Sequence, residues 1–173
     1  EVIAYDYLID SIHTTNDNGV LRIHNGKYNS EIQGMTQVRV YAPSVSGITN
    51  KGSGNIRISE YAGDSLRIET AGSGDIKAFN LELSGKLTVQ GTGSGDLEFK
   101  HITAGEMVIN KKGSGDGEFS GLNVGTLSVT SKGSGDATLS GKANFVTINK
   151  AGSGDIDASE LKAKHVETEG KGS

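Results

Sequence analysis

The tetrapeptide Gly72-Ser73-Gly74-Asp75 decides the fold, because the chain repeats it at a nearly fixed interval. Copies open at Gly72, Gly93, Gly113, Gly133 and Gly152, and an Asn variant, Gly52-Ser53-Gly54-Asn55, precedes them. Successive openings are 20, 21, 20, 20 and 19 residues apart. A period of this length is typical of a solenoid, in which each repeat buries its apolar face only against its neighbours.

The residues after each tetrapeptide predict a strand. One and three places after the Asp or Asn the residue is mostly apolar, and the residue between them is polar, as in Leu97-Glu98-Phe99. This alternation is typical of a strand with one buried face. A further apolar residue six places after the Asp, such as Leu81 or Ile102, breaks the alternation, so we expect the chain to bend there.

An apolar doublet later in each repeat, such as Leu87 and Val89, predicts another strand. Its second member precedes the next Gly-Ser-Gly by four residues in every repeat, so one corner of the repeat is tight. The variation in period is then expected at a loose opposite corner, around Gly63-Asp64, Ser84-Gly85 and Lys142–Phe145. We therefore predict an all-β, right-handed parallel β-helix with coils stacked about 4.8 Å apart.

The first 50 residues are less regular. Strands are expected over Val2–Tyr5, Val20–Ile23 and Val38–Tyr41. Asn16-Asp17-Asn18-Gly19 predicts a turn, since these residues tolerate positive φ. Tyr7–Ile12 is either a helical turn or a bend, and a polar loop is expected over His24–Gly34. We predict a single β-helix domain over 1–173, with irregular coils over 1–50 and six coils over 51–173.

Composition narrows the range of partners. The net charge is −4 and the 17 basic residues are dispersed, so nucleic acid is not an expected partner. Cysteine is absent, so there is neither a disulfide framework nor a thiolate metal site. No apolar run of 18 residues is present, so no membrane span is expected. Glu1 is no initiator methionine, and Gly170–Ser173 resembles the start of another repeat, so we expect an excerpt of a longer exported protein.

Stacked in register, the motif residues would form two ladders. The hydroxyl ladder would comprise Ser53, Ser73, Ser94, Ser114, Ser134 and Ser153, and the carboxylate ladder Asp75, Asp96, Asp116, Asp136 and Asp155. Carboxylates about 5 Å apart repel, so they need backbone N–H donors or lysines such as Lys51, Lys112 and Lys132. We favour this capping role. A row of bound cations is the alternative, although calcium-binding G-G-x-G-x-D repeats have a period of nine residues.

No catalytic, cofactor or metal residue is assigned from the sequence. The four histidines, His13, His24, His101 and His165, share no metal-ligand spacing. Glu98 and Glu118 lie one coil apart on an outward row, which is more typical of a solvated face than of a glycosidase pair. Tyrosines gather in the first third of the chain, at Tyr5, Tyr7, Tyr28, Tyr41 and Tyr61. They predict either a recognition patch or, preferably, a cover for the end of the core.

The serial GSGD blocks, preceded by Asn18–Ile23 and Val38–Pro43, resemble the putative auto-transporter adhesin, head GIN domain family. The resemblance covers nearly the whole chain. It implies a right-handed β-helix related in shape to pectin-lyase folds, without recognised catalytic residues. It also implies a bacterial protein, frequent in gut Bacteroidetes, exported behind a lipoprotein-type or secretory signal to the outer membrane, cell surface or periplasm.

Three functions are compatible with these observations. The first is a non-enzymatic, exported, adhesin-like protein that binds a host or cell-surface glycan or protein. The second is a polysaccharide-binding or polysaccharide-active protein on a pectin-lyase-like helix, which would need acidic or basic groups gathered on one face. The third is a scaffold or sensor module that self-associates or binds another chain through an open sheet edge at the helix ends.

Overall fold

The computed structural model describes residues 1–4, 11–25 and 36–171. These residues form strands and connecting turns, with no helix among them. The chain divides into two compact units, Glu1–Pro43 and Ser44–Ser173, which are described separately. The single domain over 1–173 stays a prediction. Residues 7–10 of the expected helical turn or bend lie outside the described residues, and Ile12 opens a strand.

The first unit contains two antiparallel pairs. Strand β1 (Val2–Ala4) pairs with β4 (Thr36–Val38), and β2 (Ile12–Asp17) forms a hairpin with β3 (Val20–Asn25). Asn18 and Gly19 have φ angles of 49° and 77°, so the expected turn is confirmed as a type I′ turn.

Two boundaries in this unit differ from the prediction. The strand expected at Val38–Tyr41 is wrong, because β4 ends at Val38, where its partner β1 begins. Backbone hydrogen bonds between Glu1 and Arg39, 2.8 and 2.9 Å long, close this pair. The polar loop does not begin at His24, since the hairpin register keeps His24 in β3 opposite His13.

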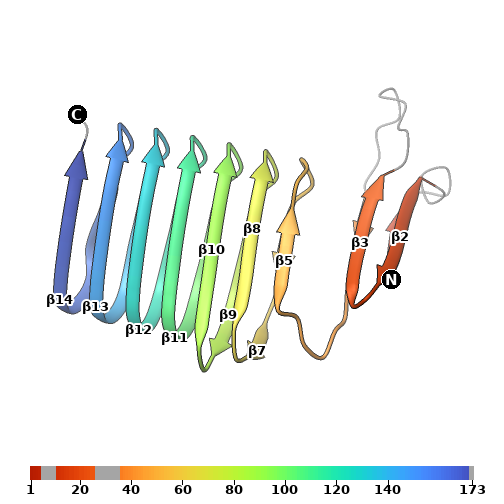
Figure 1. Ribbon diagram of the computed structural model, residues 1–173, viewed down its shortest axis with the longest axis horizontal. Coiled ribbons are helices and arrows are strands. Elements are labelled where there is room, and N and C mark those ends of the chain that lie inside the picture. The colour runs from red at the N-terminus through yellow and green to blue at the C-terminus, as the bar shows by residue number, and fades with distance from the viewer. Residues whose placement is uncertain (5–10, 26–35, 172–173) are drawn as a thin grey trace. The chain divides into compact units, whose positions relative to one another are not determined.

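The second unit is a stack of parallel strands (Figure 1). The strands are β5 (Gly47–Asn50), β6 (Ile56–Ile58), β7 (Tyr61–Gly63), β8 (Leu66–Gly72), β9 (Ile76–Leu83), β10 (Lys86–Gly93), β11 (Leu97–Gly113), β12 (Gly117–Gly133), β13 (Ala137–Gly152) and β14 (Ile156–Lys171). One face runs in the order β14-β13-β12-β11-β10-β8-β5. The stack is the predicted right-handed parallel β-helix, and it also includes β5, which the sequence placed in the irregular part.

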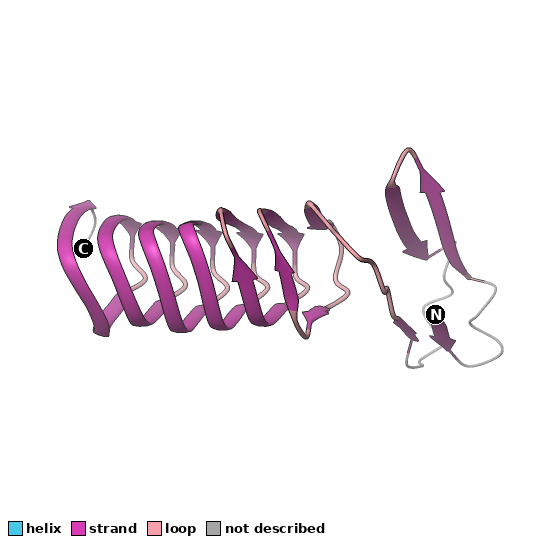
Figure 2. Cartoon of the chain, turned by 90° about the horizontal axis from the view of Figure 1, so that it is seen from below, coloured by secondary structure: helices cyan, strands magenta, loops and turns pink. Residues whose placement is uncertain are grey.

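Each coil runs along one face to the tight GSG corner, returns along the other face and crosses a loose corner (Figure 2). The expected bend in the return strand is confirmed by Asn80 and His101, whose φ angles are 54° and 59°. From β11 onward each coil is one continuous strand from one tight corner to the next.

The variation in period falls at two places rather than one. The 21-residue coil changes register at the loose corner, between the pairs Glu82↔Thr103 and Lys86↔Glu106. The 19-residue repeat is one residue shorter at the bend, because the register shifts by one between the pairs Phe119↔Leu139 and Leu122↔Gly141. The variation expected at Lys142–Phe145 is therefore wrong. A bend residue that lies outside the ladder can be deleted without breaking a ladder hydrogen bond.

The core consists of vertical columns of apolar side chains. The predicted inward positions Leu81, Ile102 and Leu122 are buried in three successive coils. The rings of Phe99 and Phe119 stack at a centroid distance of 5.4 Å. Burial falls on the last strand, where Val166 of β14 is 57% exposed.

Candidate functional site

The tight corner is held together by the predicted carboxylate ladder. Oδ1 of Asp96 accepts the backbone N–H of Asp116 from the next coil, at 2.8 Å. The same contact recurs at every step, and Asn55 starts the series by accepting from Asp75 at 2.9 Å. Backbone hydrogen bonds link the same coils in the opposite direction. The N–H of Leu97, in the earlier coil, donates to the carbonyl oxygen of Asp116, in the later coil, at 2.9 Å. These contacts support the capping role of the Asp residues.

The serines and lysines beside this ladder contribute little to it. The six motif serines form an exposed row along the edge of the stack. Among the described residues, the ladder carboxylates have one lysine ion pair, between Lys150 Nζ and Asp155 at 3.7 Å. Lys51, Lys112 and Lys132 were expected to neutralise the ladder, and they make no such pair in the part of the chain that the structure describes.

A polar column lies inside the tight corner, beneath the ladder. Asn50 Nδ2 donates to Gly54 O at 2.6 Å, and Thr70 Oγ1 donates to Gly74 O at 3.5 Å. Lys111 occupies the same column and is only 4% exposed, with its ammonium beside Gly135. Burial lowers the pKa of Lys111, although the nearby Asp116, Asp136 and Asp96 oppose that shift.

The outward acidic pair is part of an ion-pair ladder. Lys100 Nζ lies 2.8 Å from Glu98 and 3.2 Å from Glu118, and Lys77 lies 2.7 Å from the other Glu98 oxygen. The hydrogen bonds from Lys100 and Lys77 lower the pKa of Glu98 to about 2. A glycosidase acid needs a raised pKa, so the shift at Glu98 is in the opposite direction.

The other candidate residues do not converge. In residues 1–4, 11–25 and 36–171, no three His, Cys, Asp or Glu side chains form a group that could hold a metal ion. Tyr61 covers the first coil, donating to Val45 O at 2.7 Å, whereas Tyr41 is 81% exposed. Tyr5, Tyr7 and Tyr28 lie outside the described residues. The described residues contain no helix that could cross a membrane.

The loose corner departs from the repeat on the last two coils. Gly105 and Gly125 occupy this corner in β11 and β12, whereas Asn144 and Lys164 occupy it in β13 and β14. The next residue also changes, from Thr126 in β12 to Phe145 and His165. We call Asn144, Phe145, Lys164 and His165 the loose-corner surface. Because the repeat itself supplies the fold, side chains that depart from it are the best candidates for a site.

The two rings of this surface form an exposed platform. Phe145 and His165 stack at a centroid distance of 5.1 Å with only 11° between their planes. Phe145 remains 55% exposed. The other two stacked phenylalanines, Phe99 and Phe119, are buried, whereas an exposed aromatic stack favours contact with a partner.

A shallow depression of about 320 Å³ adjoins the platform. It is lined by Asn123, Val124, Lys142, Ala143, Asn144, Lys162, Ala163 and Lys164. Lys142, Lys162 and Lys164 have no ion-pair partner among the described residues, so their ammonium groups are available to a ligand. The loose-corner surface therefore combines an aromatic platform with amide and ammonium donors.

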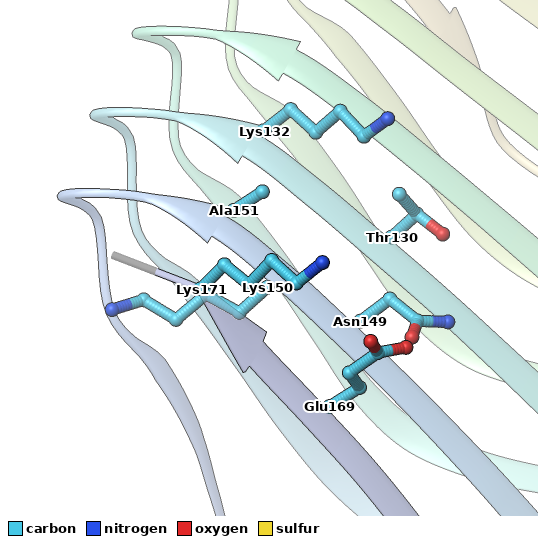
Figure 3. Close-up of a pocket in the computed structure, with 7 residues that line it drawn as sticks. All are labelled: Thr130, Lys132, Asn149, Lys150, Ala151, Glu169 and Lys171. Carbon is cyan, nitrogen blue, oxygen red and sulfur yellow. The ribbon is translucent and has the colours of Figure 1, made fainter.

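A second depression, of about 220 Å³, lies beside the tight corner of the same coils (Figure 3). Its lysines, Lys132, Lys150 and Lys171, come from β12, β13 and β14. Glu169 enters it beside Asn149, and Lys150 is already paired with Asp155. This mixture of charges makes the depression a weaker candidate than the loose-corner surface.

Sequence reasoning did not find the loose-corner surface. Phe145 and His165 are 20 residues apart, which is one repeat, so the spacing itself is a signal that they share a column. The signal was obscured because Lys142–Phe145 was assigned to a region of variable length.

Comparison with known proteins gives a family and no individual relative. No curated protein and no solved structure matches the chain. The profile of the family described as "Putative auto-transporter adhesin, head GIN domain" matches residues 1–100 and 84–173, which together cover the whole length. The chain therefore belongs to the putative auto-transporter adhesin, head GIN domain family.

Proposed function

We propose that this protein is a non-enzymatic, adhesin-like protein that is exported to the cell surface and binds a glycan through its loose-corner surface. The description of its family supports the adhesin-like role. The observation that carries the ligand class is the exposed stack of Phe145 on His165, 5.1 Å apart and nearly parallel.

The chemistry of this surface supports a glycan. An exposed pair of stacked rings offers an apolar surface for the C–H groups of a sugar, since aromatic rings combine large contact area with little lost entropy. The Asn144 amide and the Lys164 ammonium lie at the same corner and can donate to sugar hydroxyl or carboxylate oxygens. The depression is shallow and open, so it suits part of a chain better than a whole small molecule.

The non-enzymatic part of the proposal rests on the acidic residues. The pair with a defined geometry, Glu98 and Glu118, is bridged by Lys100, which keeps Glu98 ionised. Glu98 is therefore not suited to donate a proton to a glycosidic oxygen near neutral pH.

The proposal is tested with a glycan array probed with the full chain and with two variants. Phe145→Ala removes the platform, and we expect it to reduce binding at least tenfold. Phe79→Ala is the matched control, because Phe79 is a partly exposed ring elsewhere on the stack, under Arg57. It should bind as the wild type does.

Bound glycans should also be recovered uncleaved, as judged by mass spectrometry after long incubation. Equal binding by the wild type and Phe145→Ala, or no binding at all, would exclude the loose-corner surface as a glycan site. Cleaved product would overturn the non-enzymatic part alone.

A further inference from the structure

We propose that His13 and His24 form a two-histidine site for a divalent transition metal on the β2–β3 hairpin. The site lies within the first unit and does not depend on the glycan proposal. These residues have no metal-ligand spacing along the chain, because they are brought together only by the pairing of two strands.

The turn of the hairpin fixes the register that places His13 opposite His24. The two-residue type I′ turn at Asn18 and Gly19 places Asp17 opposite Val20, and counting back along both strands places His13 directly opposite His24. Cross-strand partners have Cβ atoms about 5 Å apart and project from the same side of the hairpin. Both histidine side chains are exposed, so a metal ion can reach them from solvent.

The distance between the rings fits a shared metal ion. Their centroids lie 5.4 Å apart, with 35° between the planes. A metal about 2.1 Å from a ring nitrogen is about 3.2 Å from the ring centroid, so two imidazoles at a tetrahedral angle have centroids about 5.2 Å apart. The observed separation of the centroids is therefore compatible with one nitrogen of each ring binding the same ion.

A metal ion bound by both strands would stabilise the hairpin. Strands β2 and β3 pair only with each other among the described residues, and a lone two-stranded hairpin is marginally stable in water. Val20 and Ile23 on this hairpin are 49% and 44% exposed, so burial contributes little. A metal bound to one histidine on each strand would link the strands far from the turn.

The ligand class follows from the donor set. Imidazole nitrogens suit Cu²⁺, Ni²⁺ and Zn²⁺, and affinity should follow the order in which Cu²⁺ binds most tightly. Two ligands leave positions for water or for a donor from another molecule. Thr15 and Arg22 form the next pair on the same side of the hairpin. The Arg22 charge opposes cation binding, so Arg22→Gln should tighten it.

The experiment is a calorimetric titration of the chelator-treated full chain with CuCl₂, NiCl₂ and ZnCl₂ at neutral pH. We expect one Cu²⁺ per chain, with binding weakened at least tenfold in His13→Gln and in His24→Gln. His101→Gln and His165→Gln are the matched controls, because both histidines are exposed and lie on the β-helix. Circular dichroism would check that each variant keeps its strands.

Two further readouts identify the site itself. The electron paramagnetic resonance spectrum of bound Cu²⁺ should show nitrogen coupling that is reduced in either hairpin variant. Hydrogen exchange of the β2 and β3 amides should slow when Cu²⁺ is added to the wild type and not when it is added to His13→Gln. Wild-type affinity in both hairpin variants, or no measurable binding by the wild type, would overturn the proposal.

Discussion

The backbone N–H of Asp116 donates to the carboxylate of Asp96, which lies one coil earlier, at 2.8 Å. The contact replaces a backbone acceptor that the sharp GSG corner does not provide, so each Asp side chain completes the hydrogen bonding of the following coil. Repeated at every step, it makes the carboxylate ladder a part of the backbone network. The predictions below test this view of the corner and the charges around it.

The ladder requires an acceptor oxygen rather than a negative charge. Asn55 already plays this role for Asp75, so Asp96→Asn should leave the free energy of unfolding unchanged or slightly raised, since one repulsive charge is removed. Asp96→Ala should lower it by about 1 kcal/mol, because the N–H of Asp116 loses its partner. Urea denaturation measures both. If Asn proved as harmful as Ala, the charge itself would matter, and the bound-cation alternative would gain support.

The second glycine of the motif is required by stacking rather than by its backbone angle. A Cβ at Gly115 would lie far inside van der Waals distance of the Gly95 carbonyl oxygen in the preceding coil. A Cβ at Gly54, in the first copy of the motif, would have no atom within 4 Å. We expect Gly115→Ala to destabilise the protein by about 3 kcal/mol and Gly54→Ala by a few tenths of that.

Thermal unfolding of these two variants provides a matched comparison, because the substitution and the place in the motif are the same and the following residue differs only as Asn55 from Asp116. Equal destabilisation of both would mean that backbone conformation, and not the distance between coils, selects glycine at this position.

Lys111 is buried and has no ion pair among the residues that the structure describes, so its charge should not stabilise the fold. Lys111→Met keeps most of the packing and removes the desolvated ammonium, and it should be at least as stable as the wild type at pH 7. Lys111→Ala should be less stable by about 2 kcal/mol, because it leaves a cavity. A marked loss of stability in Lys111→Met would instead identify Lys111 as the interior counter-ion of the carboxylate ladder.

The pH dependence of this variant has a definite sign. Burial lowers the pKa of Lys111 below its ordinary 10.5, so between the two values the unfolded chain binds more protons than the folded one. The free energy of unfolding of the wild type should therefore rise relative to that of Lys111→Met as the pH increases towards 10.5. Urea midpoints measured from pH 7 to pH 10.5 test this difference.

Glu98 should contribute to acid unfolding. Its pKa is lowered from 4.5 to about 2, so its stabilising effect is complete above pH 4.5 and is lost as the pH falls towards 2. Glu98→Gln should have a shallower loss of stability over that range. Because the lysine partners are solvent-accessible, the difference should shrink in 1 M NaCl. Identical acid transitions for the wild type and Glu98→Gln would contradict a stabilising role of the ion pairs that Glu98 makes with Lys77 and Lys100.

Much of the fold could be predicted from the sequence, because the same spacing and alternation recur in successive repeats. The constant four-residue spacing before each Gly-Ser-Gly predicted the tight corner, and the broken parity at Leu81 and Ile102 predicted the bend that positive φ angles confirm. The buried positions followed from the same alternation, including Phe99 and Phe119. These features recur in successive coils, so comparing the repeats was sufficient to predict them.

Only the tertiary structure decided which outward side chains are neighbours. The register between coils changes by one residue, sometimes at the loose corner and sometimes at the bend, and the sequence does not distinguish the two. Phe145 meets His165 because the register returns to 20 residues before the loose corner, and His13 meets His24 through the pairing of the hairpin strands. The repeat determined the scaffold because each coil buries the same face. The candidate sites depend on side chains outside that repeat, and strand register places those side chains together.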